Sequence, residues 1–172
     1  ITTLDELKAA KFGDRTIADA ITEQVGKIGE KIDIAHYALI KGDLIVSYIH
    51  SNKKNGSLLA LNAPAATEEI LNAGRQVGMQ IVSMNPIALD KNDVPQDVVE
   101  REMEIGKELA RQEGKPEAML EKIATGRLNK FYEENTLLNQ VFVIDTSKKI
   151  SQMLDGVSKG LTVTAFKKVT LG

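Results

Sequence analysis

Apolar residues recur at spacings of three and four in several stretches of the chain, and this periodicity predicts amphipathic helices. In the stretch 16–30, Ile17, Ile21, Val25 and Ile28 fall on one stripe, which is expected to pack inward. Further helices are expected over 65–84, 96–112 and 117–133, with a short helix over 147–155 and another that runs to about residue 11 after a capping box at residues 3–6.

Elsewhere the apolar pattern alternates with a period of two, which predicts strands. Strands are expected over 31–40, 44–51 and 57–61. The connections between them are short, and short connections join antiparallel strands, so an antiparallel meander is expected. A last alternating segment, 161–169, can return to the same sheet.

The helices 96–112 and 117–133 are separated by Gly114-Lys115-Pro116. Glycine closes helices and proline opens them, so the two helices are expected to fold back as an antiparallel hairpin. The inward seam of the first is expected to comprise Val98, Val99, Met103, Ile105, Leu109 and Ala110.

These elements predict an α+β fold, a small antiparallel sheet packed with helices plus a projecting antiparallel helical (coiled-coil) hairpin. The expected organisation is leading helices over 1–30, a sheet-and-helix subdomain over 31–94, the hairpin insertion over 95–134, and a return segment over 135–172.

Composition excludes several classes of function. The chain carries 24 acidic and 22 basic residues, a net charge of −2, so no nucleic-acid footprint is expected. No apolar run approaches the roughly 20 residues that span a bilayer, so no membrane segment is expected. Without cysteine there is no disulfide or thiolate metal site. The chain begins at Ile1 rather than methionine, so we expect a fragment or a processed chain that lacks an N-terminal part.

Candidate catalytic groups are sparse. A hydrolase built on His36 or His50 would require these histidines, on different predicted strands, to converge with a carboxylate, whereas a lone strand histidine more often packs or donates a hydrogen bond. The acidic residues near position 100 alternate with basic ones, which is typical of a solvated helix face. No Gly-Lys pair has the pattern of a phosphate loop. We therefore expect no catalytic residue, no metal and no cofactor, and the pattern indicates an interaction module.

Six phrases in order resemble the bacterial translation elongation factor Ts family. The most specific is the run from Glu121 to Tyr132, EKIATGRLNKFY. The others are KIGEKI at 27–32, YIH at 48–50, VPQDVVERE at 94–102, GKPE at 114–117 and QVFV at 140–143.

The resemblance implies a cytoplasmic guanine-nucleotide exchange factor, not an enzyme, that binds elongation factor Tu and promotes release of GDP. It further implies partner contacts at Ile28, Gly29 and His50, with Tyr48 on the same face as His50 and either in the core or at the interface. The chain departs from the family in a longer loop over 51–57, and it contains no Thr-Asp-Phe-Val motif. We therefore expect binding without efficient exchange.

Alternatives stay open at this point. Ile28 could pack in a core, and Gly29 could simply close its helix. The whole chain could be a coiled-coil scaffold or dimerisation module without a GTPase partner. A homodimer is compatible with either interpretation.

Overall fold

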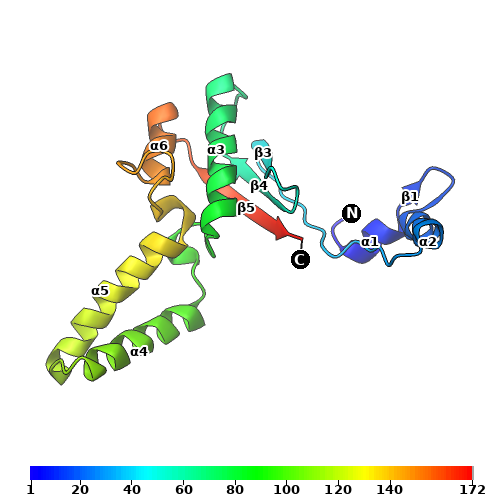
Figure 1. The fold of residues 1–172 in the computed structure, drawn as a ribbon. Helices are drawn as coiled ribbons and strands as arrows, with labels where there is room; N and C mark the ends of the chain where they lie inside the picture. Colours follow the sequence, from blue (N-terminus) through cyan, green and yellow to red (C-terminus); the bar gives the residue numbers. More distant parts are fainter. Residues whose placement is uncertain (172) are drawn as a thin grey trace. The chain divides into compact units, whose positions relative to one another are not determined.

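The computed structural model describes residues 1–171. The chain divides into two compact units, Ile1–Leu39 and Ile40–Gly172 (Figure 1). Among the described residues, no helix is both long and apolar enough to cross a membrane.

The first unit is built around two capped helices. Thr3 starts helix α1 (Leu4–Ala9) and Thr16 starts helix α2 (Ile17–Ile28), each through a capping box with an acidic residue three positions later. Between the helices, the two-residue strands β1 (Lys11–Phe12) and β2 (Arg15–Thr16) pair antiparallel. Both helices lie where the sequence predicts them.

The strand predicted over 31–40 is wrong, because this segment has no regular secondary structure. Alternation places side chains on two faces, but a strand forms only when a second backbone takes up its N–H and C=O groups. Within residues 1–171 the backbone of this segment pairs with no strand. Side chains tie the segment back: the Tyr37 hydroxyl donates to the carbonyl of Ile1 at 2.9 Å, and Asp33 forms an ion pair with Lys8 of α1.

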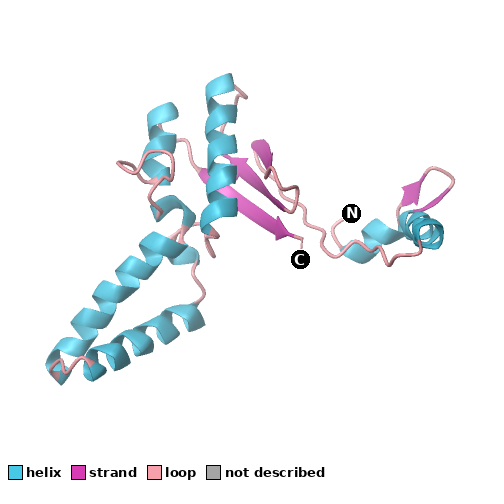
Figure 2. Cartoon of the chain, viewed as in Figure 1, coloured by secondary structure: helices cyan, strands magenta, loops and turns pink. Residues whose placement is uncertain are grey.

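The second unit contains a three-stranded antiparallel sheet in the order β3-β4-β5 (Figure 2). Strands β3 (Leu44–Ile49) and β4 (Asn55–Leu61) form a hairpin, as predicted. Strand β5 (Val163–Thr170) returns from the end of the chain to pair with β4, which makes β4 the central strand. The predicted meander is therefore corrected: its third strand is β5, and 31–40 takes no part.

Helix α3 (Glu68–Met84) packs against one face of this sheet through small residues. A Cβ added at Gly74 would lie 2.7 Å from Val46, and one at Gly78 would lie 2.6 Å from Cβ of Tyr48. The helix therefore touches β3 with bare backbone. The helix expected over 65–84 is confirmed, and its buried face comprises Ile70, Ala73, Val77 and Ile81 beside glycines. The buried core around it includes Val46, Leu59, Leu61, Leu137, Ile150, Leu154 and Val163.

Helices α4 (Gln96–Gln112) and α5 (Glu117–Asn135) form the predicted hairpin and extend from the sheet and α3 in Figure 1. Gly106 is buried against Ala124, at a spacing where even a Cβ would meet Ala124 Cα at 3.0 Å. Of the predicted seam, Ala110 is buried as expected, whereas Ile105 and Leu109 are exposed; Gly106, which the prediction left out, is the other buried residue of α4. Supercoiling of the pair stays a prediction.

A buried polar network joins α3 to the segment after the hairpin. The Gln80 side-chain amide donates to Gln140 Oε1 at 3.1 Å and to the Val141 carbonyl at 3.0 Å, and it accepts from the Val143 N–H at 3.0 Å. Because every polar group of Gln80 is used, this network fixes the path of the chain into α6. The remaining elements are the 3₁₀ helices η1 (Lys91–Asp93) and η2 (Leu137–Asn139) and helix α6 (Ile150–Val157).

Candidate partner-binding site

The end of helix α2 carries the first two predicted contact residues. Gly29 adopts φ of 76°, a left-handed conformation that favours glycine, and its N–H donates to the Val25 carbonyl at 2.9 Å. No atom lies within 4 Å of the position where a Cβ of Gly29 would stand. Gly29 therefore ends helix α2, which was one of the two interpretations of this residue, and the space beside it is open.

Ile28 is 55% exposed, so it is not a core residue of this unit. None of residues 1–39 is buried, although α2 has the predicted apolar stripe. Ile28 instead borders an open apolar groove of about 380 Å³. Its lining is Phe12, Ile17, Ala20, Ile21, Gln24, Ile28 and Ile32.

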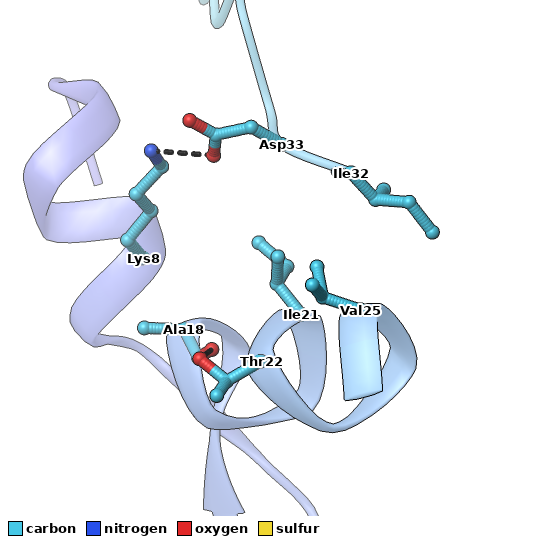
Figure 3. Close-up of a pocket in the computed structure, with 7 residues that line it drawn as sticks. All are labelled: Lys8, Ala18, Ile21, Thr22, Val25, Ile32 and Asp33. Carbon is cyan, nitrogen blue, oxygen red and sulfur yellow. Dashed lines mark hydrogen bonds and ion pairs between the residues drawn. The ribbon is translucent and has the colours of Figure 1, made fainter. Parts of the chain in front are cut away.

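A second groove of about 320 Å³ lies on the adjoining side of α2 (Figure 3). Ile21 and Val25 of the helix line it together with Ile32, while Lys8 of α1 and Asp33 form an ion pair of 2.7 Å at its edge. The hydrogen bond from Lys8, and a further one from the Ile34 N–H, hold the pKa of Asp33 below its usual value. The pair ties the segment after α2 to α1, which sets where Ile32 lies in both grooves.

The other two predicted residues stand at the end of strand β3. The Tyr48 hydroxyl and Nδ1 of His50 are 3.0 Å apart and form a hydrogen bond, with the ring centroids 6.1 Å apart. The backbone of His50 is also fixed, because its N–H donates to the Asn55 carbonyl and its carbonyl accepts from the Lys53 N–H, both at 2.8 Å. The prediction that Tyr48 and His50 share one face is confirmed.

Tyr48 itself is half-buried, and its inner end lies on helix α3. Its Cβ sits directly above Gly78, and its cross-strand neighbour Ser57 donates a hydrogen bond to the Gly78 carbonyl at 3.0 Å. A glycine at position 78 is what lets the ring approach so closely. The base of Tyr48 therefore packs on helix α3, and its hydroxyl meets His50.

The structure adds one exposed group that the sequence analysis did not single out. Ile49, between Tyr48 and His50, is 73% exposed on the sheet face opposite α3. Both Ile49 and Val169 pair with Gly56, so the two side chains flank a bare glycine on that face. Strand alternation already implied that Ile49 points away from Tyr48, and this was the signal that could have found it.

The four predicted residues fall into two groups. Ile28 and Gly29 belong to the first unit, and Tyr48 and His50 to the second. His36 is an exposed residue of the first unit. Over residues 1–171, no group of three or more histidine and carboxylate side chains could hold a metal ion. An open apolar groove, an exposed isoleucine and an oriented imidazole are features of a protein-binding module.

The comparison with known proteins shows the family. The family model described as Elongation factor TS matches residues 1–172, and the chain belongs to this family. It is similar to Elongation factor Ts of Cytophaga hutchinsonii (56% identical over 98% of the chain) and of Amoebophilus asiaticus (46% over 99%). Each match covers 61% of that relative. Elongation factor Ts of Gluconobacter oxydans is 38% identical over 98% of the chain and 58% of its own length. The chain thus spans about three fifths of these relatives.

Proposed function

We propose that this chain is the partner-binding part of a guanine-nucleotide exchange factor of translation elongation, which binds elongation factor Tu and promotes release of GDP. The observation that carries the proposal is the family match over the whole chain. The exposure of Ile28, the open space beside Gly29 and the hydrogen bond that orients the half-buried His50 support their role as contacts. This role is cytoplasmic.

The proposed mechanism is thermodynamic linkage and not covalent chemistry, so the chain is not an enzyme. An exchange factor binds the empty GTPase more tightly than the GDP-bound form, and reciprocity then requires that its binding weaken GDP by the same factor. The factor acts only through this differential affinity. No residue needs to change protonation or form a bond.

The chain contains no Thr-Asp-Phe-Val, the motif to which the family resemblance attributes the disturbance of the nucleotide site. We therefore propose that residues 1–172 bind the GTPase but accelerate GDP release poorly. The test is release of fluorescent GDP from bacterial elongation factor Tu with and without the chain, beside a direct binding titration. Full exchange activity would refute the second part, and absence of binding would refute the first.

Variants assign the contacts. Ile28→Ala and His50→Ala should each weaken binding, whereas His36→Ala, a change at an exposed histidine outside the proposed site, should leave it unchanged. Equal effects of the two histidine variants would contradict the site.

A scaffold that acts through the helical hairpin is the alternative, because Ile105, Leu109 and Met119 are exposed there. It predicts that deletion of 96–133 abolishes all binding and that Ile28→Ala and His50→Ala have no effect. Light scattering of the purified chain tests the homodimer, which is compatible with both functions.

A further inference from the structure

The hydrogen bond between Tyr48 and His50 determines more than where the imidazole lies. A neutral histidine carries its proton on one ring nitrogen, and the bond made by the other nitrogen decides which one. Here Nδ1 is the nitrogen that meets a protein partner. The choice of donor in this pair therefore sets the chemistry of the nitrogen on the far side of the ring.

Tyrosine is the donor that the chemistry favours. Its hydroxyl can donate and accept, but the phenol proton is more acidic than an imidazole N–H, and an unprotonated imidazole nitrogen is the better acceptor of the two. Donation by Tyr48 leaves Nδ1 without a proton and puts the proton on Nε2. His50 then offers an N–H donor away from Tyr48.

The tyrosine is well placed to impose this choice because it cannot move easily. Its Cβ is against the bare backbone at Gly78, and Ser57 beside it is bonded to the same backbone carbonyl. Both backbone polar groups of His50 are also bonded in the β3–β4 turn: its N–H donates to the Asn55 carbonyl, and its carbonyl accepts from the Lys53 N–H. The hydroxyl and Nδ1 are therefore held together by packing on one side and by the turn on the other.

We propose that Tyr48 is a positioning residue for partner binding: it holds His50 in the Nε2–H tautomer and directs that N–H to an oxygen acceptor, a carbonyl or carboxylate, of the bound GTPase. The proposal rests on the proposed function. It gives Tyr48 a role through its hydroxyl in addition to the packing of its base on Gly78.

The first experiment uses the chain alone. Long-range ¹H–¹⁵N spectra at about pH 8, above the ordinary titration range of imidazole, report the tautomer of each histidine. The chain has two, and exposed His36, with no hydrogen bond within residues 1–171, serves as the internal reference. His50 should show an unprotonated Nδ1 and a protonated Nε2, and Tyr48→Phe should move it to the averaged pattern of His36. A protonated Nδ1, or a spectrum that Tyr48→Phe leaves unchanged, would overturn the proposal.

The second experiment uses nucleotide-free elongation factor Tu. Tyr48→Phe should weaken binding by about 3- to 10-fold, the range of one net hydrogen bond. His50→Gln, whose amide can replace Nε2–H, should bind more tightly than His50→Asn, whose amide lies nearer to Nδ1. Normal affinity of Tyr48→Phe beside weak affinity of His50→Ala would overturn the positioning role. Normal affinity of His50→Ala would overturn the contact as well, while the tautomer measurement still decides the hydrogen bond.

Discussion

Gly78 gives the sharpest stability prediction, because the contact between α3 and β3 leaves no room for a methyl group. In Gly78→Ala the new Cβ would stand 2.6 Å from Cβ of Tyr48 and 3.1 Å from Oγ of Ser57. Carbon atoms in ordinary contact are about 3.5–4.0 Å apart, so the helix and strand must separate by about 1 Å. Cβ of Tyr48 is attached to the strand backbone and cannot rotate away.

The magnitude follows from two opposing terms. Overpacking of this kind costs about 1–3 kcal/mol. Alanine regains up to about 1 kcal/mol because it is the better helix former. With the full offset, we expect Gly78→Ala to lower the free energy of unfolding by up to about 2 kcal/mol.

Gly126 is the matched control, since it too is a helical glycine but has no atom within 4 Å of an added Cβ. Gly126→Ala should stabilise the protein by about 0.5–1 kcal/mol. Urea unfolding followed by circular dichroism measures both, with the slope m checked for constancy. If Gly78→Ala is as stable as Gly126→Ala, the close approach of α3 and β3 is refuted.

Four further predictions follow from the contacts. Gln80→Leu should lower the free energy of unfolding, measured with urea, by about 1–3 kcal/mol, because the Val143 N–H loses the oxygen to which it donates. An unchanged midpoint would exclude the network. Leu120→Ala, at a 3% exposed position, should cost about 2–5 kcal/mol, and half-buried Leu128→Ala clearly less; the reverse order would contradict the seam. The hydrogen bonds from Thr16 lower the pKa of Asp19 below 3.8, so this cap stabilises α2 above that pH and is lost as the pH falls through the lower folded value. In Asp19→Asn the stability of α2 should not depend on pH in this range, whereas in the parent protein it should fall in acid. Amides of 31–40 should exchange with deuterium at nearly the rate of an unfolded chain, whereas slow exchange would reveal pairing.

The helices could be predicted from sequence because their determinants are local. The Thr16 cap and the stripe from Ile17 to Ile28 lie within one segment, and α2 begins and ends within two residues of its prediction. The prediction of a strand over 31–40 failed because alternation specifies two faces but no second strand with which to pair. In α4 the helical period left the position of the seam uncertain by one residue. In the structure Gly106 lies in the seam and Ile105 does not, because small residues allow the two helices to approach.

Some features of the candidate site could likewise be predicted from local sequence, and others could not. That Tyr48 and His50 share a face follows from strand alternation, and the structure confirms it. The contact of Tyr48 with Gly78 joins residues from different elements, so no local pattern contains it. The apolar stripe indicated burial of Ile28, whereas the family resemblance implied an accessible contact there. The pattern could not decide between the two, and in the structure nothing in residues 1–39 buries that stripe.

The position of β5 in the sheet has a consequence for synthesis of the protein. Its partner β4 is central, yet about a hundred residues separate the end of β4 from the start of β5. At about 5–20 residues per second, a ribosome needs about 5–20 s to make that stretch. Throughout this time β4 has one unpaired edge, which is the kind of edge that recruits foreign strands. Helix α3 follows β4 directly and can cover Leu59 and Leu61 early. Protection of β4 in the nascent chain therefore depends on the order of the elements: α3 covers one face of the sheet first, and β5 pairs with the open edge of β4 last.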